Sequence, residues 1–223
     1  MEKRRSFLYS LIASLAVTAL IGAGALKRVD KWAQDWFFQK PGVSSGDIII
    51  IGIDEDALAE LGPYHTWSRE VIASVLEKLS EVPEKKPAVT AVDILYAGSS
   101  SASADSRLAE AAGELGNVVT ASMAEFGERI NWENGRAVSL YGAAVVGYEQ
   151  PYEELRLCTE QGHINIMPDK DGIIRHGLLY VEPEGKEGAK VFSMAGETAR
   201  IYLEQEGREL VLPPVTSFSK SCV

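Results

Sequence analysis

Residues 6–26 contain no charged side chain, and this run limits what the chain can become more than any other feature. A helix of these 21 residues rises about 1.5 Å per residue and reaches about 30 Å, the thickness of the hydrocarbon core of a bilayer. Lys3, Arg4 and Arg5 precede the run and favour a cytoplasmic N-terminus. We therefore predict a single-pass anchor in the cell membrane, with the bulk of the chain extracytoplasmic.

A cleaved signal peptide is the alternative, because Ala23-Gly24-Ala25 fits a small-x-small cleavage pattern. The apolar run is longer than a usual signal core, which favours an uncleaved anchor. Lys27, Arg28 and Lys31 follow the run and oppose the predicted orientation. In both interpretations the remainder of the chain is exported.

The charge of the chain argues against nucleic acid as a partner. The formal net charge is -10, and the excess of acids lies after the basic head, with no basic stripe. Cys158 and Cys222 are the only cysteines, and no CxxC or Cys/His cluster is present. We expect two free thiols rather than a disulfide, no metal site and no cofactor.

The region after the anchor alternates between helical and strand patterns. "DIIIIGID" (47–54) is typical of a strand that is buried on both faces. A strand, an amphipathic helix and a second strand form a right-handed unit with parallel strands. The expected strands are 47–54, 88–97 and 117–124, and the expected helices are 27–40, 54–62, 68–82 and 105–116.

The second half of the chain changes character. Asn134-Gly135 between alternating segments is a strong signal for an antiparallel hairpin. Beyond it we expect a helix at 151–162, two strands joined by a tight turn within 163–182, and a helix at 191–207. The predicted fold class is α/β: a mostly parallel central sheet with flanking helices on both faces and an antiparallel hairpin addition, preceded by an N-terminal transmembrane helix.

Helix ends are predicted from capping residues. Ser68, Asp105 and Ser193 are the expected N-caps. Gly62, Gly116 and Gly162 are the expected helix stops.

The predicted segments are a basic cytoplasmic head (1–5), the anchor (6–26), a juxtamembrane helix (27–40), an extracytoplasmic domain (41–212) and a disordered tail (213–223). The juxtamembrane helix carries Trp32, Trp36 and Phe37 near one face. Aromatic side chains suit the membrane–water interface, and packing onto the domain explains them equally well.

Acidic residues end two of the predicted parallel strands. Asp54 follows the first strand, Asp93 lies near the end of the second, and Asp105 lies past a serine-rich loop. Ligands of parallel sheets gather beyond the carboxyl ends of the strands. Three carboxylates there would suit Mg²⁺ or Ca²⁺, or acid–base chemistry. We favour the structural interpretation, in which Asp56 and Asp105 cap helices and the other acids bond loop amides.

"GPYHTWSR" (62–69) is the less generic feature. An arginine beside a tryptophan can stack on it or clamp a carboxylate of a ligand. Arg69 can equally pin the loop by pairing with Asp54 or Asp93, and we favour this pinning role. If a ligand binds, the predicted site is the carboxyl edge of the sheet: Asp54, Trp67, Arg69, Asp93 and Asp105.

Motifs for catalysis are missing from the sequence. There is no nucleophile elbow and no Gly-rich phosphate loop. His65, His163 and His176 lie on different predicted elements without ligand spacing, and we interpret each as a surface or loop histidine. "PDKDG" (168–172) has only part of a calcium loop and is better explained as a turn.

Four ordered blocks resemble the type-two CHASE domain, an extracellular sensory domain associated with bacterial adenylate and guanylate cyclases and histidine kinases. These blocks are "DWFF" (35–38), "IIIIGIDEDALAELGPYHTWSR" (48–69), "AVDILYAGSSSASADSRLAEA" (91–111) and "GHINIMPDKDGIIRHGLLY" (162–180). Thr66 and Ser68 stand where the family has prolines. The family normally continues with a closing strand, transmembrane helices and a cytoplasmic effector, so we expect a C-terminally truncated form without its output module.

The resemblance implies a membrane-anchored sensor for signal transduction with no catalysis of its own. Its expected partners are the membrane and an unknown small-molecule or envelope ligand, and the sequence is compatible with a homodimer. The alternative function is a secreted or anchored metal-dependent hydrolase that uses Asp54, Asp93 and Asp105. A purely structural envelope protein is a third interpretation.

Overall fold

The computed structural model describes residues 2–22, 24–38, 42, 46–133, 136–169, 171–183 and 189–211, and their side chains except those of 2–3, 25–28, 38 and 128–144. The chain divides into two compact units, Met1–Asp54 and Glu55–Val223.

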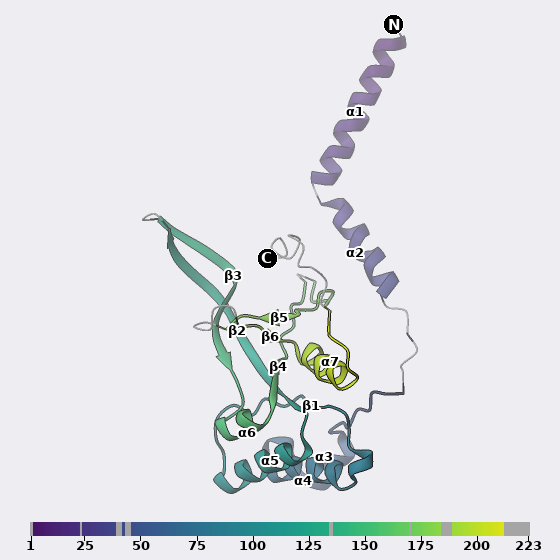
Figure 1. Ribbon diagram of the computed structural model, residues 1–223. Coiled ribbons are helices and arrows are strands. Elements are labelled where there is room, and N and C mark those ends of the chain that lie inside the picture. The colour runs from purple at the N-terminus through teal and green to yellow at the C-terminus, as the bar shows by residue number, and fades with distance from the viewer. Residues whose placement is uncertain are drawn as a thin grey trace. The chain divides into compact units, whose positions relative to one another are not determined.

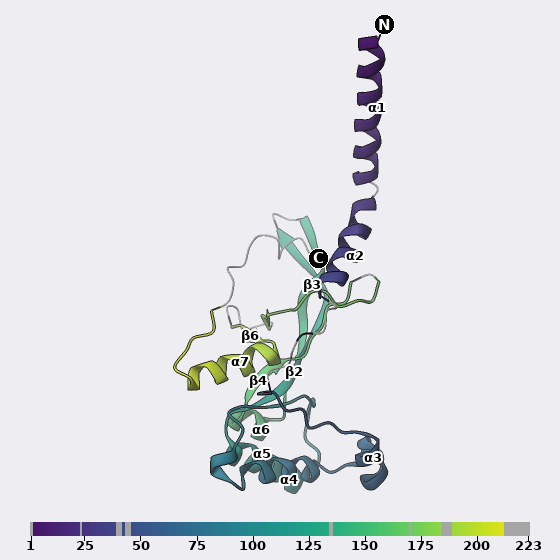
Figure 2. The ribbon, with the colours of Figure 1, turned by 90° about the vertical axis from the view of Figure 1, so that its right-hand side faces the viewer.

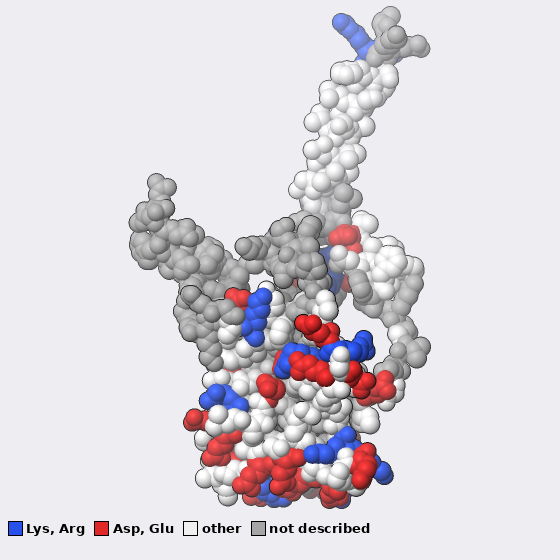
Figure 3. All heavy atoms as spheres, in the orientation of Figure 1, with Lys and Arg blue, Asp and Glu red and all other residues white. Residues whose placement is uncertain are grey.

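The first unit contains two helices, α1 (Glu2–Gly22) and α2 (Ala25–Phe38) (Figure 1). Within α1, the segment Arg4–Gly22 is long and apolar enough to cross a membrane. Gly24 separates the two helices with a φ of 73°, a backbone conformation that favours glycine. The predicted N-terminal apolar helix is therefore confirmed. In the space-filling view, uncharged side chains cover α1 beyond its basic start (Figure 3).

The strand predicted at 47–54 is wrong. Residues 48–54 form no regular element, and Ile48, Ile49 and Ile50 are 82–87% exposed. No strand that the structure describes pairs with this segment. A β-branched run has strand propensity, but a strand forms only where a neighbour supplies its backbone hydrogen bonds. The sequence pattern does not reveal whether such a neighbour exists.

The second unit is built on a mixed sheet of four strands: β1 (Thr90–Val92), β2 (Val118–Glu133), β3 (Arg136–Glu149) and β4 (Glu160–His163). The first part of β2 pairs in parallel with β1 on one side and with β4 on the other. The second part of β2 forms a long antiparallel hairpin with β3 (Figure 1). A small antiparallel pair, β5 (Tyr180–Val181) and β6 (Val191–Phe192), completes the strands described. The predicted α/β class is confirmed.

Helices cover both faces of the parallel part of the sheet. The helices described in this unit are α3 (Glu55–Leu61), α4 (Arg69–Ser80), α5 (Ala102–Leu115), α6 (Glu153–Cys158) and α7 (Met194–Gln205), with short 3₁₀ turns at Tyr64–Thr66 and Pro83–Lys85. Val118 points to α5 and α6. Gly162, which pairs with Ala121, meets α7 instead. Because neighbouring positions of a strand face opposite sides, α7 covers the other face. In both views α4 and α5 lie side by side (Figures 1 and 2).

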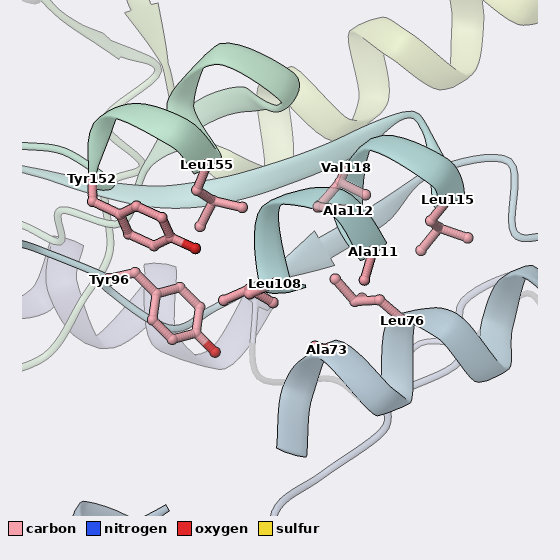
Figure 4. Close-up of a cluster of buried hydrophobic side chains, with 10 residues drawn as sticks. All are labelled: Ala73, Leu76, Tyr96, Leu108, Ala111, Ala112, Leu115, Val118, Tyr152 and Leu155. Atoms are coloured by element: carbon pink, nitrogen blue, oxygen red, sulfur yellow. The ribbon is translucent and has the colours of Figure 1, made fainter. Parts of the chain in front are cut away.

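The hydrophobic core lies between the sheet and the helices α4, α5 and α6 (Figure 4). Leu108 and Leu155 are each 1% exposed and contribute from α5 and α6. Small residues of α5, such as Ala111 and Ala112, let α4 approach closely. Burial of each large apolar side chain stabilises the fold by about 1.5–3 kcal/mol. This core fixes the start of α4 against the start of α5.

Most predicted helix ends are confirmed. The Ser68 and Ser193 hydroxyls accept hydrogen bonds at the starts of α4 and α7. Gly62 and Gly116 end helices with φ values of 82° and 68°. The prediction of Asp105 as an N-cap is wrong, because α5 begins at Ala102 and its N-cap is Ser101. The turn residues 134–135 of the confirmed hairpin lie outside the described residues.

Three further expectations differ from the structure. The strand predicted at 88–97 is only three residues long, so Asp93 to Gly98 form a loop beyond β1. The helix predicted at 151–162 ends at Cys158, and Gly162 lies inside β4. The two strands expected within 163–182 are wrong, because only an isolated bridge between Met167 and His176 forms there and β5 pairs with β6 instead. The turn between them is confirmed, since the Gly172 amide donates to the carbonyl of Asp169 at 2.8 Å.

Candidate functional site

Arg69, the first residue of α4, links three segments at the carboxyl end of the sheet. Its guanidinium donates to Oδ1 of Asp105 at 2.8 Å and to the carbonyl of Gly98 at 2.7 Å. The side chains of Arg69 and Asp105 are 12% and 5% exposed. The pinning role predicted for Arg69 is confirmed, but the carboxylate with which it pairs is Asp105 rather than the predicted Asp54 or Asp93.

Two tyrosine rings enclose the Arg69 guanidinium. Its carbon lies 4.5 Å from the ring centroid of Tyr152 and 5.3 Å from that of Tyr96. The Tyr152 hydroxyl donates to the backbone carbonyl of Asp105 at 2.7 Å, and the Tyr152 amide donates to the carbonyl of Tyr96 at 3.1 Å. Cation–π contact adds to the ion pair where the cation is desolvated. The start of α4 is thus fixed to α5 and to the segment before α6.

Both carboxylate oxygens of Asp105 are occupied by protein donors. Oδ1 accepts from Arg69, and Oδ2 accepts from the backbone amide of Ser100 at 2.8 Å. Asp105 also lies in the first turn of α5, where the helix dipole favours a negative charge. A cation at this carboxylate would have to displace the Arg69 guanidinium. This geometry disfavours Asp105 as a metal ligand, and so disfavours the hydrolase interpretation that depends on it.

Trp67 holds the loop between α3 and α4. Its Nε1 donates to the carbonyl of Gly62 at 2.8 Å, and its ring packs edge-on against Tyr64 at 5.4 Å between centroids. The Thr66 hydroxyl donates to the carbonyl of Pro63 at 2.8 Å. The loop is therefore fixed by hydrogen bonds at the positions where the related pattern has prolines.

The remaining predicted site residues are placed differently. Asp93 is exposed and lies one residue beyond β1. Asp54 is the last residue of the first unit and immediately precedes α3. The structure therefore brings together Arg69 and Asp105, and the participation of Asp54 in a ligand site stays a prediction.

Sequence reasoning missed Tyr96 and Tyr152. Both are 7% exposed, and they come from segments more than fifty positions apart in the chain. Burial is the main cause that raises the pKa of Tyr152 to about 12, so its hydroxyl stays protonated and donates. The Tyr96 hydroxyl is buried and has no hydrogen-bond partner among the described residues. The sequence signal was an aromatic residue close to an arginine, which pointed to Trp67 and Arg69. Nothing in the sequence shows that the segments of Tyr96 and Tyr152 meet at Arg69.

The interpretation of His163 as a surface or loop residue is wrong. His163 ends β4 and is 1% exposed. Its neighbour in β2 is Ser122, whose hydroxyl accepts a hydrogen bond from the Tyr148 hydroxyl at 2.7 Å. A lone histidine beside a glycine in the sequence carries no burial pattern, so only the pairing of β4 with β2 reveals its position.

Fold and site together define an α/β domain whose polar edge is held by a buried ion pair between two tyrosine rings. The chain belongs to the CHASE2 domain family, whose model matches residues 12–220, and this is a family of extracellular sensory domains. The resemblance seen in the four sequence blocks is thereby confirmed. Searches of curated proteins and of solved structures found no similar protein.

Proposed function

We propose that this chain is the membrane-anchored, extracytoplasmic ligand-sensing domain of a bacterial signal-transduction protein. The observation that carries the proposal is α1, an apolar helix of sufficient length to cross a membrane, which lies at the N-terminal end of a chain whose residues 12–220 match an extracellular sensory family. Lys3, Arg4 and Arg5 at the N-terminal end of α1 support a cytoplasmic N-terminus. The expected partners are the lipid bilayer and a small ligand.

The ligand site that we propose is the carboxyl edge of the sheet, with Trp67, Arg69, Asp93 and Asp105. Arg69 and Asp105 shape this edge, because their charges are paired with each other. The exposed carboxylate of Asp93 supplies a group that a ligand can reach. The Tyr96 hydroxyl, whose ring contacts Arg69, has no partner among the described residues, and this supports a polar ligand, since a buried hydroxyl without a partner is costly. Sensing then shifts the populations of two arrangements of the domain.

Asp93→Ala tests the sensing function, because this exposed side chain is not part of the ion pair that holds the fold. The full chain is joined to the cyclase module of a longer relative, and cyclic-nucleotide output is measured in cells across a fixed panel of growth media. We expect Asp93→Ala to abolish the variation in output among media while export stays normal.

The matched control is Glu84→Ala, another exposed acid, in the turn after α4. It is expected to keep the variation. An unchanged range of output in Asp93→Ala, with normal export, would contradict the proposed ligand site.

A further inference from the structure

The imidazole of His163 is a buried polar group that the proposed ligand site does not use. His163 is 1% exposed, and neither ring nitrogen has a hydrogen-bond partner among the described residues. An unsatisfied buried polar group destabilises the folded state, so its presence requires an explanation. The other two histidines of the chain, His65 and His176, are exposed.

The surroundings of the imidazole are uncharged. Ser122 and His163 are register partners in parallel strands, so their side chains leave the same face of the sheet. Ser122 is 0% exposed, and its hydroxyl is bonded to that of Tyr148. Thr120, two positions earlier on the same face, bonds to Thr159 and to the carbonyl of Glu160. These neutral groups offer no charge to balance an imidazolium.

Most charged groups of the neighbouring elements are paired elsewhere, exposed, or carried by the opposite face of β4. On α7, Arg200 pairs with Glu197 and Glu204. This helix lies on the opposite face of β4, where Gly162 meets Met194. The strand β6 is apolar, and Glu160 of β4 and Glu125 of β2 are exposed. The charged residues of α5 include Asp105, which pairs with Arg69, and Arg107, which pairs with Glu77. The titratable groups of α6 are Glu153, Glu154, Arg156 and Cys158. Burial lowers the pKa of His163 from its usual 6.5.

The backbone at His163 is tied to the start of α7. His163 forms a parallel bridge with Ser193, and the Ser193 hydroxyl caps α7 by accepting from the Gly196 amide at 3.1 Å. The Ser193 amide donates to the carbonyl of Leu179 at 2.8 Å. The imidazole leaves the face of β4 opposite α7 and is 1% exposed, so water reaches a charged ring only when β4 moves relative to its neighbours. Movement of β4 also disturbs its backbone bridge to Ser193, at the start of α7.

We propose that His163 makes this domain a proton sensor, in which uptake of a proton by the buried imidazole displaces β4 and loosens its backbone bridge to Ser193, at the start of α7, in acidic surroundings. The inference deepens the proposed sensory function and rests on it for its setting, because an exported domain meets the external pH. The folded state binds this proton less readily than the unfolded chain does. The contribution of His163 to stability is therefore complete above pH 6.5 and is lost as the pH falls below that value.

The test is the pH dependence of unfolding of the purified full chain in detergent micelles, measured by denaturant titration between pH 7.5 and 5.5. In the wild type the unfolding constant is expected to rise below pH 6.5 by up to about tenfold per pH unit. In His163→Gln this rise is expected to disappear. Hydrogen exchange of residues 160–164 and 193–197, corrected for the intrinsic effect of pH, is expected to quicken on acidification in the wild type alone.

The matched control is the double variant His65→Gln/His176→Gln, which replaces the exposed histidines and is expected to keep the wild-type profile. If His163→Gln does not fold, the profile of the double variant tests the proposal, because His163 is the only histidine that this variant retains. A flat profile in the wild type or in the double variant would overturn the proposal. These measurements do not depend on membrane topology. A result that contradicts the proton sensor therefore leaves the proposed anchoring intact, and a result that contradicts the anchoring leaves the proton sensor intact.

Discussion

Arg69→Ala is expected to lower the free energy of unfolding of the domain by about 3–5 kcal/mol, because it leaves the Asp105 carboxylate buried without its counter-ion. It also removes the hydrogen bond to Gly98 and the cation that fills the space between Tyr96 and Tyr152. Denaturant titration of the detergent-solubilised chain measures the change. A loss of this size is a large share of the about 5–15 kcal/mol that holds a typical domain together.

A double variant separates the charge from the lost contacts. Arg69→Ala/Asp105→Asn replaces the stranded carboxylate by a neutral amide and is expected to recover part of the loss. Lys78→Ala, which breaks an ion pair whose side chains are 74% and 55% exposed, is the matched control and is expected to change little. A loss no larger for Arg69→Ala than for Lys78→Ala would show that the buried pair does not hold the edge.

Gly162→Ala is expected to destabilise the domain by about 3 kcal/mol through a backbone clash between β4 and α7. An added Cβ would overlap Cα of Met194 and lie 2.8 Å from its amide nitrogen. These are backbone atoms of the first residue of α7, so no side-chain rotation relieves the overlap. The strand and the helix must move apart, and the thermal unfolding midpoint falls accordingly.

Gly113→Ala is the matched control, and it is expected to change the thermal unfolding midpoint in the opposite direction. Gly113 lies in α5, and an added Cβ would make an ordinary contact of 3.6 Å with Cβ of Cys158. Alanine is more favourable than glycine in a helix by about 0.5–1 kcal/mol, so the midpoint is expected to rise. Equal changes in the two variants would contradict the close approach of α7 to β4.

Local signals predicted the helix ends well. Ser68, Ser193, Gly62 and Gly116 each act through neighbours within a few positions, so the sequence contains all the partners that decide their roles. The α/β class followed from the alternation of apolar strands and amphipathic helices for the same reason.

Features that depend on distant partners were predicted less well. Arg69 was expected to pin the loop, but the identity of its partner depends on where α5 begins, three positions before the expected start. Gly162 was expected to end a helix because a glycine follows a helical pattern there. Its actual role, the close approach of Met194, is set by the packing of α7 on β4.

The isoleucine run shows the limit of pattern reading most clearly. Residues 48–53 have a strong strand signal, and the structure gives them no strand partner among the described residues. Strand propensity measures how well a side chain fits a pleated surface, and it says nothing about whether a neighbouring strand is available.

The central claim, that the domain is held outside the cytoplasm by α1, is tested by the accessibility of Cys158. This thiol is exposed in the domain, and Cys222→Ser leaves it as the single cysteine. The residue is exposed but its sulfur is partly covered, and this partial burial raises the pKa of the Cys158 thiol, so labelling with a membrane-impermeant maleimide is carried out at mildly alkaline pH.

Spheroplasts that carry the full chain are labelled before and after lysis. The control variant Glu2→Cys/Cys158→Ser/Cys222→Ser places the single thiol before the span and is expected to react only after lysis. We predict that Cys158 is labelled in intact spheroplasts and that the labelled chain stays in the membrane fraction. Labelling of Cys158 only after lysis would contradict the account.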